Sequence, residues 1–206
     1  MFLEMIKSIV LGIVEGISEW LPISSTGHMI LVNELINNTE GFTASDLYLY
    51  VIQLGAILAV VTLYFHKLNP FSPKKTNVEK ENTWKMWFKV IIACVPAAVI
   101  GFVLDNFMSA WENWQVVSAM LILYGVAFIV VESLHKETKI ESMDDMTYKT
   151  ALLIGLFQVL SIVPGTSRSG ATILGAMLIG CSRSVAAEFS FFLAIPVMFG
   201  VSLLKV

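Results

Sequence analysis

Two short polar stretches interrupt a chain that is otherwise strongly apolar. The first, EGISEWLPISSTGH, covers residues 15–28, and the second, PGTSRSGAT, covers residues 164–172. Together they contain carboxylates, hydroxyls, glycines, an imidazole and a guanidinium. Because polar groups are costly to place in apolar surroundings without partners, their concentration in two places indicates a functional site.

The first stretch contains a pair of carboxylates that can act together. Glu15 and Glu19 are four residues apart, so they share one face of a helix. An ionised side chain at mid-membrane costs at least about 2.5–3.5 kcal/mol. The pair therefore needs a partner, for which Arg168 and a divalent cation are the candidates. A purely structural Glu–Arg ion pair is the alternative.

Both stretches place glycines and hydroxyls just before a helix, where free backbone N–H groups and the helix dipole attract anions. Arg168 adds a bidentate donor suited to phosphate. The candidate anion-binding residues are Ser24, Thr26, Gly27, Gly165, Thr166, Ser167, Ser169, Gly170 and Thr172. For any single hydroxyl, a bond to its own helix backbone is the alternative.

Ser25 and His28 are three residues apart, so both could contact one ligand. His28 could serve as general base, nucleophile or phosphate donor. The sequence leaves the nucleophile open among Ser25, His28 and water. Phosphoryl transfer needs mainly positioning and charge neutralisation, which this set supplies. A site inside the bilayer favours a lipid phosphate as substrate.

The composition indicates what must position these residues. Of 206 residues, 56% are hydrophobic and 14% charged, against about 25% charged in soluble domains. Four apolar runs approach the roughly 20 residues needed to cross the hydrocarbon, namely 47–65, 86–104, 114–131 and 189–204. These runs predict an all-α polytopic membrane protein. The net charge of −3 gives no basic face for nucleic acid.

The charges between the runs predict a topology. The connections 66–89 and 132–149 hold six and three lysines, so both are expected in the cytoplasm. The connections 32–46 and 105–113 hold neither lysine nor arginine, which suits the outer side.

The polar stretches lie between helical segments too short to span a bilayer. Pro22 separates Ile6–Leu21 from Ile23–Ile36, and the second stretch lies inside Ala151–Ser182. Each segment pair predicts a re-entrant hairpin, whose irregular tip must be covered by protein or water. For the first, one ordinary span followed by a surface helix is the alternative.

The two hairpins resemble each other. A shift of 143 residues lays 12–36 on 155–179 with eight of 25 positions identical, and Glu15 falls on Gln158. The three spans between the copies make the repeat inverted, with its broken helices meeting near the midplane. We predict one membrane domain, 1–206, with repeat one at 1–143 and repeat two at 144–206. Repeat two has one span where repeat one has three, so it is expected to be truncated.

Both stretches, together with QLGAILAV from Gln53 and EFSFFLAIP from Glu188, resemble the undecaprenyl-pyrophosphate phosphatase family of the bacitracin-resistance type. The resemblance implies hydrolysis of undecaprenyl diphosphate to undecaprenyl phosphate and inorganic phosphate. This reaction recycles the lipid carrier for peptidoglycan, and so serves cell-wall biogenesis, cell shape and bacitracin resistance.

The resemblance also implies a cofactor, a location and key residues. A divalent cation, Mg²⁺ or Ca²⁺, is expected, in a multi-pass protein of the bacterial plasma membrane that forms a homodimer and whose site opens to the outer face. Carried over by motif, the functional residues are Glu15, Glu19, Ser25, His28, Ser167 and Arg168. Family members continue with further spans.

A lipid-phosphate transporter or flippase is the rival function. Inverted repeats with helices broken at mid-membrane are a transporter trait. Transport alone, however, does not require the combination of hydroxyls, arginine and histidine. A non-catalytic membrane scaffold is the third reading.

Overall fold

The computed structural model describes residues 2–38, 41–108, 114–134 and 137–205, and this part of the chain is helical. Within it, β structure is limited to one isolated parallel bridge between Ile140 and Cys181. The elements are α1 (Phe2–Ser18), α2 (Ser25–Leu35), η1 (Phe42–Ala44), α3 (Asp46–Leu63), α4 (Phe65–Leu68), α5 (Asn77–Met108), α6 (Trp114–Ser133), α7 (Tyr148–Gln158), η3 (Val159–Ile162), α8 (Arg168–Ile179) and α9 (Arg183–Lys205). The predicted all-α fold is confirmed.

Three of the four predicted spans are helices long and apolar enough to cross a membrane: Asn77–Leu104, Gln115–Ser133 and Arg183–Leu203. The fourth is shorter than predicted, because α3 ends at Leu63 and a turn at Tyr64 leads into α4. There Lys67 pairs with Glu188 of α9, at 2.5 Å. The apolar stretch therefore ends at α4, which carries the polar residues His66 and Lys67.

The predicted connection 66–89 is too long, because α5 already begins at Asn77. The sequence carries a signal for this start. The side chain of Thr76 accepts a hydrogen bond from the N–H of Glu79, while the carboxylate of Glu79 accepts one from the N–H of Thr76. This reciprocal capping box satisfies two free N–H groups at the helix start.

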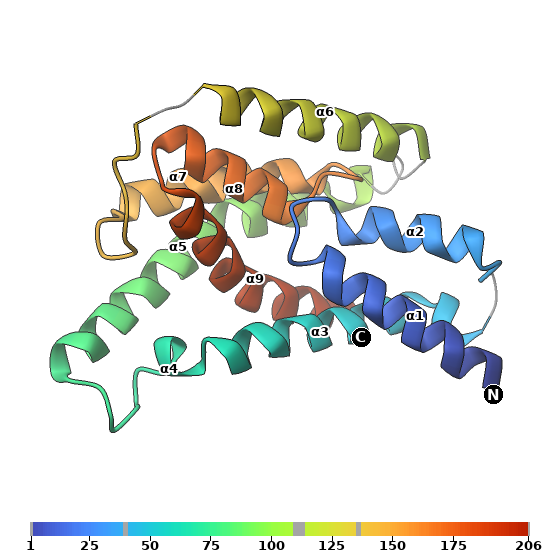
Figure 1. Cartoon of the computed structure of the whole chain (residues 1–206), viewed down its shortest axis with the longest axis horizontal. Coiled ribbons are helices and arrows are strands. Elements are labelled where there is room, and N and C mark those ends of the chain that lie inside the picture. Colours follow the sequence, from blue (N-terminus) through green and yellow to red (C-terminus); the bar gives the residue numbers. More distant parts are fainter. Residues whose placement is uncertain (1, 39–40, 109–113, 135–136, 206) are drawn as a thin grey trace.

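The polar stretches form the tips of two helical hairpins, α1–α2 and α7–α8. Figure 1 shows the blue and orange hairpins entering from opposite ends of the molecule, so that their tips meet in the middle. Both predicted hairpins are therefore present, and they are inverted relative to each other. The division of the chain into repeats at residue 143 stays a prediction.

The connections lie at two ends of the molecule. The lysine-rich connections, α4 to α5 and α6 to α7, share one end, whereas the α2–α3 connection lies at the other (Figure 1). This arrangement agrees with the predicted topology. Of the predicted connection 105–113, the first residues extend α5 to Met108, and 109–113 lie outside the described residues.

The main core lies around the second hairpin. Val90 and Ala93 of α5, Ile154 of α7 and Phe189 of α9 are fully buried there. Gly155 lets α7 approach α5 closely, because a Cβ at this position would lie 2.3 Å from the carbonyl oxygen of Ala93. The first hairpin packs on α3 through a smaller cluster, Leu11, Met29 and Tyr48.

Candidate active site at the meeting hairpin tips

Direct contacts join the two hairpin tips. The guanidinium Nη2 of Arg168 lies 2.7 Å from Oε1 of Glu19. The hydroxyl of Ser169 donates to the carbonyl of Leu21 at 3.5 Å. A Cβ added at Gly170 would lie 3.3 Å from the carbonyl oxygen of Pro22. The two polar stretches, about 140 residues apart in sequence, therefore form one site.

Matching serine caps begin α2 and α8. The hydroxyl of Ser24 accepts from the N–H of Gly27 at 3.3 Å, and that of Ser167 accepts from the N–H of Gly170 at 3.0 Å. Both helices thus begin at the meeting tips, where their dipoles favour negative charge. The tip loops place two anion-attracting helix ends at one point.

Glu19 links the candidate nucleophile to the arginine. Its Oε1 is held by Arg168, and its Oε2 accepts a hydrogen bond from the Ser25 hydroxyl at 2.5 Å. The Ser25 proton therefore already points at a carboxylate. Hydrogen bonds to ionised groups are short and strong, so these two bonds fix the side chains of Ser25, Glu19 and Arg168.

Several buried polar atoms of the site lack partners. Within the described part of the chain, Oε1 of Glu15, Nη1 of Arg168 and Oγ1 of Thr166 are buried without a hydrogen bond. Buried polar groups are normally satisfied, so each such atom requires an explanation. A bound anion at Arg168 and a cation or proton at Glu15 would supply the missing partners.

His28 is held in one tautomer. Its Nδ1 lies 2.9 Å from the carbonyl oxygen of Ser24. Because a carbonyl oxygen only accepts, Nδ1–H is the donor and, in the neutral ring, Nε2 carries a lone pair. His28 can therefore accept a proton or, when charged, donate a hydrogen bond to phosphate.

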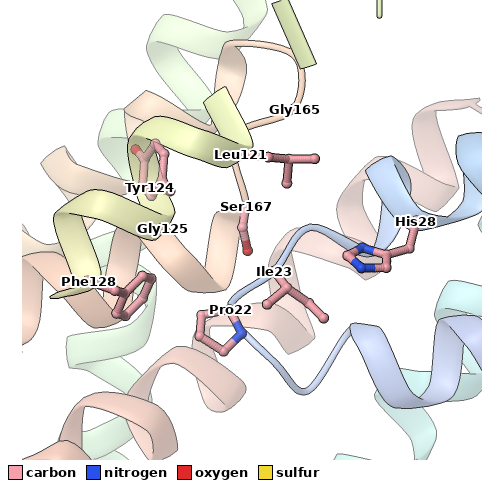
Figure 2. A pocket seen from close by; sticks show the side chains of 9 residues that line it. All are labelled: Pro22, Ile23, His28, Leu121, Tyr124, Gly125, Phe128, Gly165 and Ser167. Atoms are coloured by element: carbon pink, nitrogen blue, oxygen red, sulfur yellow. The ribbon is translucent and has the colours of Figure 1, made fainter. Parts of the chain in front are cut away.

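A cavity of about 410 Å³ lies between the tips and α6 (Figure 2). It is lined by Pro22, Ile23, His28, Leu121, Tyr124, Gly125, Phe128, Gly165 and Ser167. Gly165, at φ +84°, allows the second tip to lie against α6, because a Cβ there would be 2.5 Å from Cα of Val117. The cavity places His28 and Ser167 opposite a largely apolar wall.

Sequence reasoning missed the α6 residues, which it treated as part of an ordinary span. The signal was present, because Leu121, Tyr124, Gly125 and Phe128 recur at helical spacing on one face. Within an apolar helix, however, nothing distinguishes a face that lines a cavity from one that meets lipid.

Gln158 is a second residue that sequence reasoning left out of the site. It is the counterpart of Glu15, and each side chain is only 1% exposed. Neither polar atom of the Gln158 amide has a partner within the described residues. The alignment with Glu15 was its only signal.

Two of the predicted anion-binding residues, Thr26 and Thr172, are placed less favourably for contact with an anion between the tips. Thr26 is exposed, while its neighbours Ser25 and Gly27 are buried. The Thr172 hydroxyl bonds the carbonyls of Arg168 and Ser169, and the Ser190 hydroxyl at 2.7 Å. Thr172 therefore bonds its own helix backbone, which was the alternative to anion binding, and its hydroxyl also links α8 to Ser190 of α9.

The candidate metal ligands are the carboxylates of Glu15 and Glu19. No group of three or more His, Cys, Asp or Glu side chains comes together among the residues that the structure describes. Mg²⁺ is often held by one or two carboxylates plus substrate phosphates, so Glu15 and Glu19 fit such an ion once phosphate is present. The cation stays a prediction.

The fold and site together define a class. This is a multi-pass helical membrane protein in which two hairpins bring an arginine, a carboxylate pair, a serine and two helix N-termini to one largely buried point. Such a site suits the phosphate of a membrane lipid.

Residues 8–206 match the model of the family described as bacitracin resistance protein BacA, and the chain belongs to this family. It is 59% identical over 209 residues to an undecaprenyl-diphosphatase of Enterococcus faecalis, a match that covers 100% of this chain and 76% of that protein. It is 60% identical over 206 residues to one of Limosilactobacillus fermentum, covering 98% and 75%. A third, from Latilactobacillus sakei, is 58% identical over 208 residues, covering 99% and 75%. The family resemblance seen in the sequence is confirmed.

Proposed function

We propose that this chain hydrolyses undecaprenyl diphosphate to undecaprenyl phosphate and inorganic phosphate, and so recycles a lipid carrier of cell-wall synthesis. The observation that carries the proposal is the hydrogen-bonded series Ser25–Glu19–Arg168, in which Nη1 of the guanidinium has no partner among the described residues. Relatives of 58–60% identity are named undecaprenyl-diphosphatase. The transporter alternative is not favoured.

The terminal phosphate is expected to bind between the tips. Nη1 of Arg168 is buried, has no partner in the described part of the chain and can donate to a phosphate oxygen, while Nη2 stays on Glu19. Amide N–H groups at the starts of α2 and α8 add donors that need no rearrangement. Donors fixed in advance around developing charge make the largest contribution to many enzymes.

Ser25 is the nucleophile that the geometry supports. Its Oγ attacks the terminal phosphorus and passes its proton to Oε2 of Glu19, 2.5 Å away. A new P–O bond to Ser25 forms as the bridging P–O bond breaks, and undecaprenyl phosphate leaves with the bonding electrons. Water then attacks the phosphoserine, giving its proton to Nε2 of His28, and Glu19 returns a proton to Ser25 as phosphate is released.

We propose that Glu15 and Glu19 hold a divalent cation, Mg²⁺ or Ca²⁺, with the substrate phosphates. Bound there, it would neutralise phosphate charge. Oε1 of Glu15 supports this assignment, because it is buried without a hydrogen-bond partner among the described residues and a cation would supply one.

The lysines support an orientation for the proposed enzyme. The end of the molecule that holds the two lysine-rich connections would face the cytoplasm of a bacterial plasma membrane. The tip of the first hairpin would then be reached from the outer face, at which α1 begins. Homodimer formation remains a proposal, with the oligomeric state in detergent as its test.

Phosphate release tests the function. The purified chain is assayed with a polyprenyl diphosphate, with Mg²⁺ and with chelator. We expect metal-dependent release that falls by about 10³-fold or more in Ser25→Ala, whose loss removes covalent catalysis. Thr62→Ala is the control, because that exposed hydroxyl donates to the carbonyl of Ala59 in its own helix. Absence of release from the unaltered chain would contradict the proposal.

Trapping of a phosphoenzyme distinguishes attack by Ser25 from direct attack by water. Acid quenching with terminally labelled substrate should give phosphoserine at Ser25. If phosphate is released and no labelled protein forms at any time point, water attacks the substrate directly and Ser25 only positions it.

A further inference from the structure

The cavity between α6 and the tips has two chemically different sides. His28 and Ser167 belong to the proposed phosphate site, and both line this cavity. Most of the remaining lining is apolar, from Pro22, Ile23 and the α6 face. Figure 2 shows the Ser167 hydroxyl and the Leu121 and Ile23 side chains directed into the same space, with His28 across from them. Such a lining matches a ligand whose charged end continues into hydrocarbon.

The inner face of α6 differs from its outer face. Leu121, Tyr124 and Phe128 are partly covered, whereas the neighbouring Ile122, Leu123 and Ile129 are each more than half exposed, as suits contact with lipid. The inner residues therefore border both the cavity and the bilayer. A hydrocarbon chain starting at the phosphate site can pass along them into the membrane.

Gly125 leaves a gap in this inner face. A Cβ built there has no atom of the described residues within 4 Å, although Gly125 lines the cavity and larger side chains flank it. The helix itself does not require a glycine, which lowers helix stability by about 0.5–1 kcal/mol relative to alanine. A cavity of this size holds only a small-molecule segment, so a long tail must continue into lipid.

We propose that this cavity binds the isoprene units adjoining the diphosphate, and that the gap at Gly125 determines the bulk accepted there. The proposal rests on the proposed function and adds a specificity-determining wall, Leu121, Tyr124, Gly125 and Phe128, to it. Contact with apolar side chains stabilises such a segment by about 0.8 kcal/mol for each buried methylene.

Filling the gap tests the proposal. Gly125→Leu is compared with Gly55→Leu, which adds the same side chain to another exposed helical glycine, in α3, with nothing within 4 Å. We expect KM for a polyprenyl diphosphate to rise at least tenfold in Gly125→Leu, with kcat changed by less than about threefold. Gly55→Leu should match the unaltered chain. Equal KM values for all three proteins would overturn the proposal.

A binding measurement keeps this result separate from activity. A prenyl diphosphate with a photoreactive group in the isoprene next to the diphosphate should label residues 121–128 in the unaltered chain. Gly125→Leu should reduce labelling and Gly55→Leu should not. Labelling confined to other helices would overturn the proposal. Labelling of α6 without phosphate release would instead leave the cavity assignment standing while the proposed function fails.

Discussion

The two hairpins share a backbone plan and differ in chemistry. At positions 143 residues apart, Ser24 and Ser167 cap α2 and α8, each through the N–H three residues later. The next position is Ser25 in one hairpin and Arg168 in the other, and one turn of α1 and α7 presents Glu15 or Gln158. One hairpin thus brings carboxylates and the proposed nucleophile, and the other brings a cation and neutral donors.

Their packing differs as well. In α8, eight residues are buried, from Ser169 to Ala176, and the hairpin lies in the main core with α5 and α9. In α2, Ser25, Gly27 and Met29 are buried. Two hairpins with the same backbone arrangement can therefore place complementary charges at one point, provided that they are inverted relative to each other and meet at their tips.

The largest expected effect concerns Arg168, which follows the Ser167 cap of α8 where Ser25 follows the Ser24 cap of α2. Arg168→Ala should lower kcat by about 10²–10³-fold or more, because it removes the proposed donor to phosphate and the partner of Glu19. Arg168→Lys should recover only part of this loss, because lysine lacks the planar fork. Phosphate release from folded protein, verified by gel filtration, is the measurement. Full activity in Arg168→Lys would show that charge alone suffices.

The next comparison exchanges the side chains of Glu15 and Gln158 one at a time. Glu15→Gln should keep the fold and lower kcat by about 10²-fold, because acid–base or metal-positioning groups contribute on this scale. Gln158→Glu should instead lower the melting temperature, because it creates a carboxylate in a fully buried place without a partner. Thermal unfolding and phosphate release on both variants decide the matter. Retained activity in the first and unchanged stability in the second would make the hairpins interchangeable.

A smaller effect is expected at the equivalent glycines Gly12 and Gly155. Gly155→Ala should destabilise the fold by about 1–3 kcal/mol, because the new Cβ would overlap the backbone of Ala93. Gly12→Ala should be stabilising by about 0.5–1 kcal/mol, because nothing lies within 4 Å and alanine favours the helix. Melting temperatures in one detergent give the comparison. A drop in both would mean that α1 is packed as tightly as α7.

The smallest effect concerns the caps. Ser24 has φ 65°, which is strained for a residue with a Cβ, whereas Ser167 has φ −65°. Ser24→Gly should raise the melting temperature by about 2–4 °C, because it relieves strain of about 1 kcal/mol. Ser167→Gly should lower it slightly, through loss of the cap alone. Shifts of the same sign would show that the strain at Ser24 contributes nothing to stability.

Much of the site was predictable because it depends on local chemistry. Glycine–hydroxyl stretches before a helix predict caps and anion sites, and the spacing of Glu15 and Glu19 predicts a shared face. The pairing of Glu19 with Arg168 was a candidate because buried charges require partners. The start of α5 at Asn77 was also readable, from its capping box, but was missed.

By itself, the sequence determined the helices, the two broken hairpins, their likeness and the charged groups that must meet, because hydropathy, caps and burial costs act locally or through composition. Only the tertiary structure decided that the Ser25 hydroxyl donates to Glu19 and that the Thr172 hydroxyl contacts Ser190 of α9. It also decided that α6 closes a cavity against the tips. These choices depend on which faces of apolar helices pack together. Many apolar residues suit that packing equally well, so the pattern along the chain does not encode it uniquely.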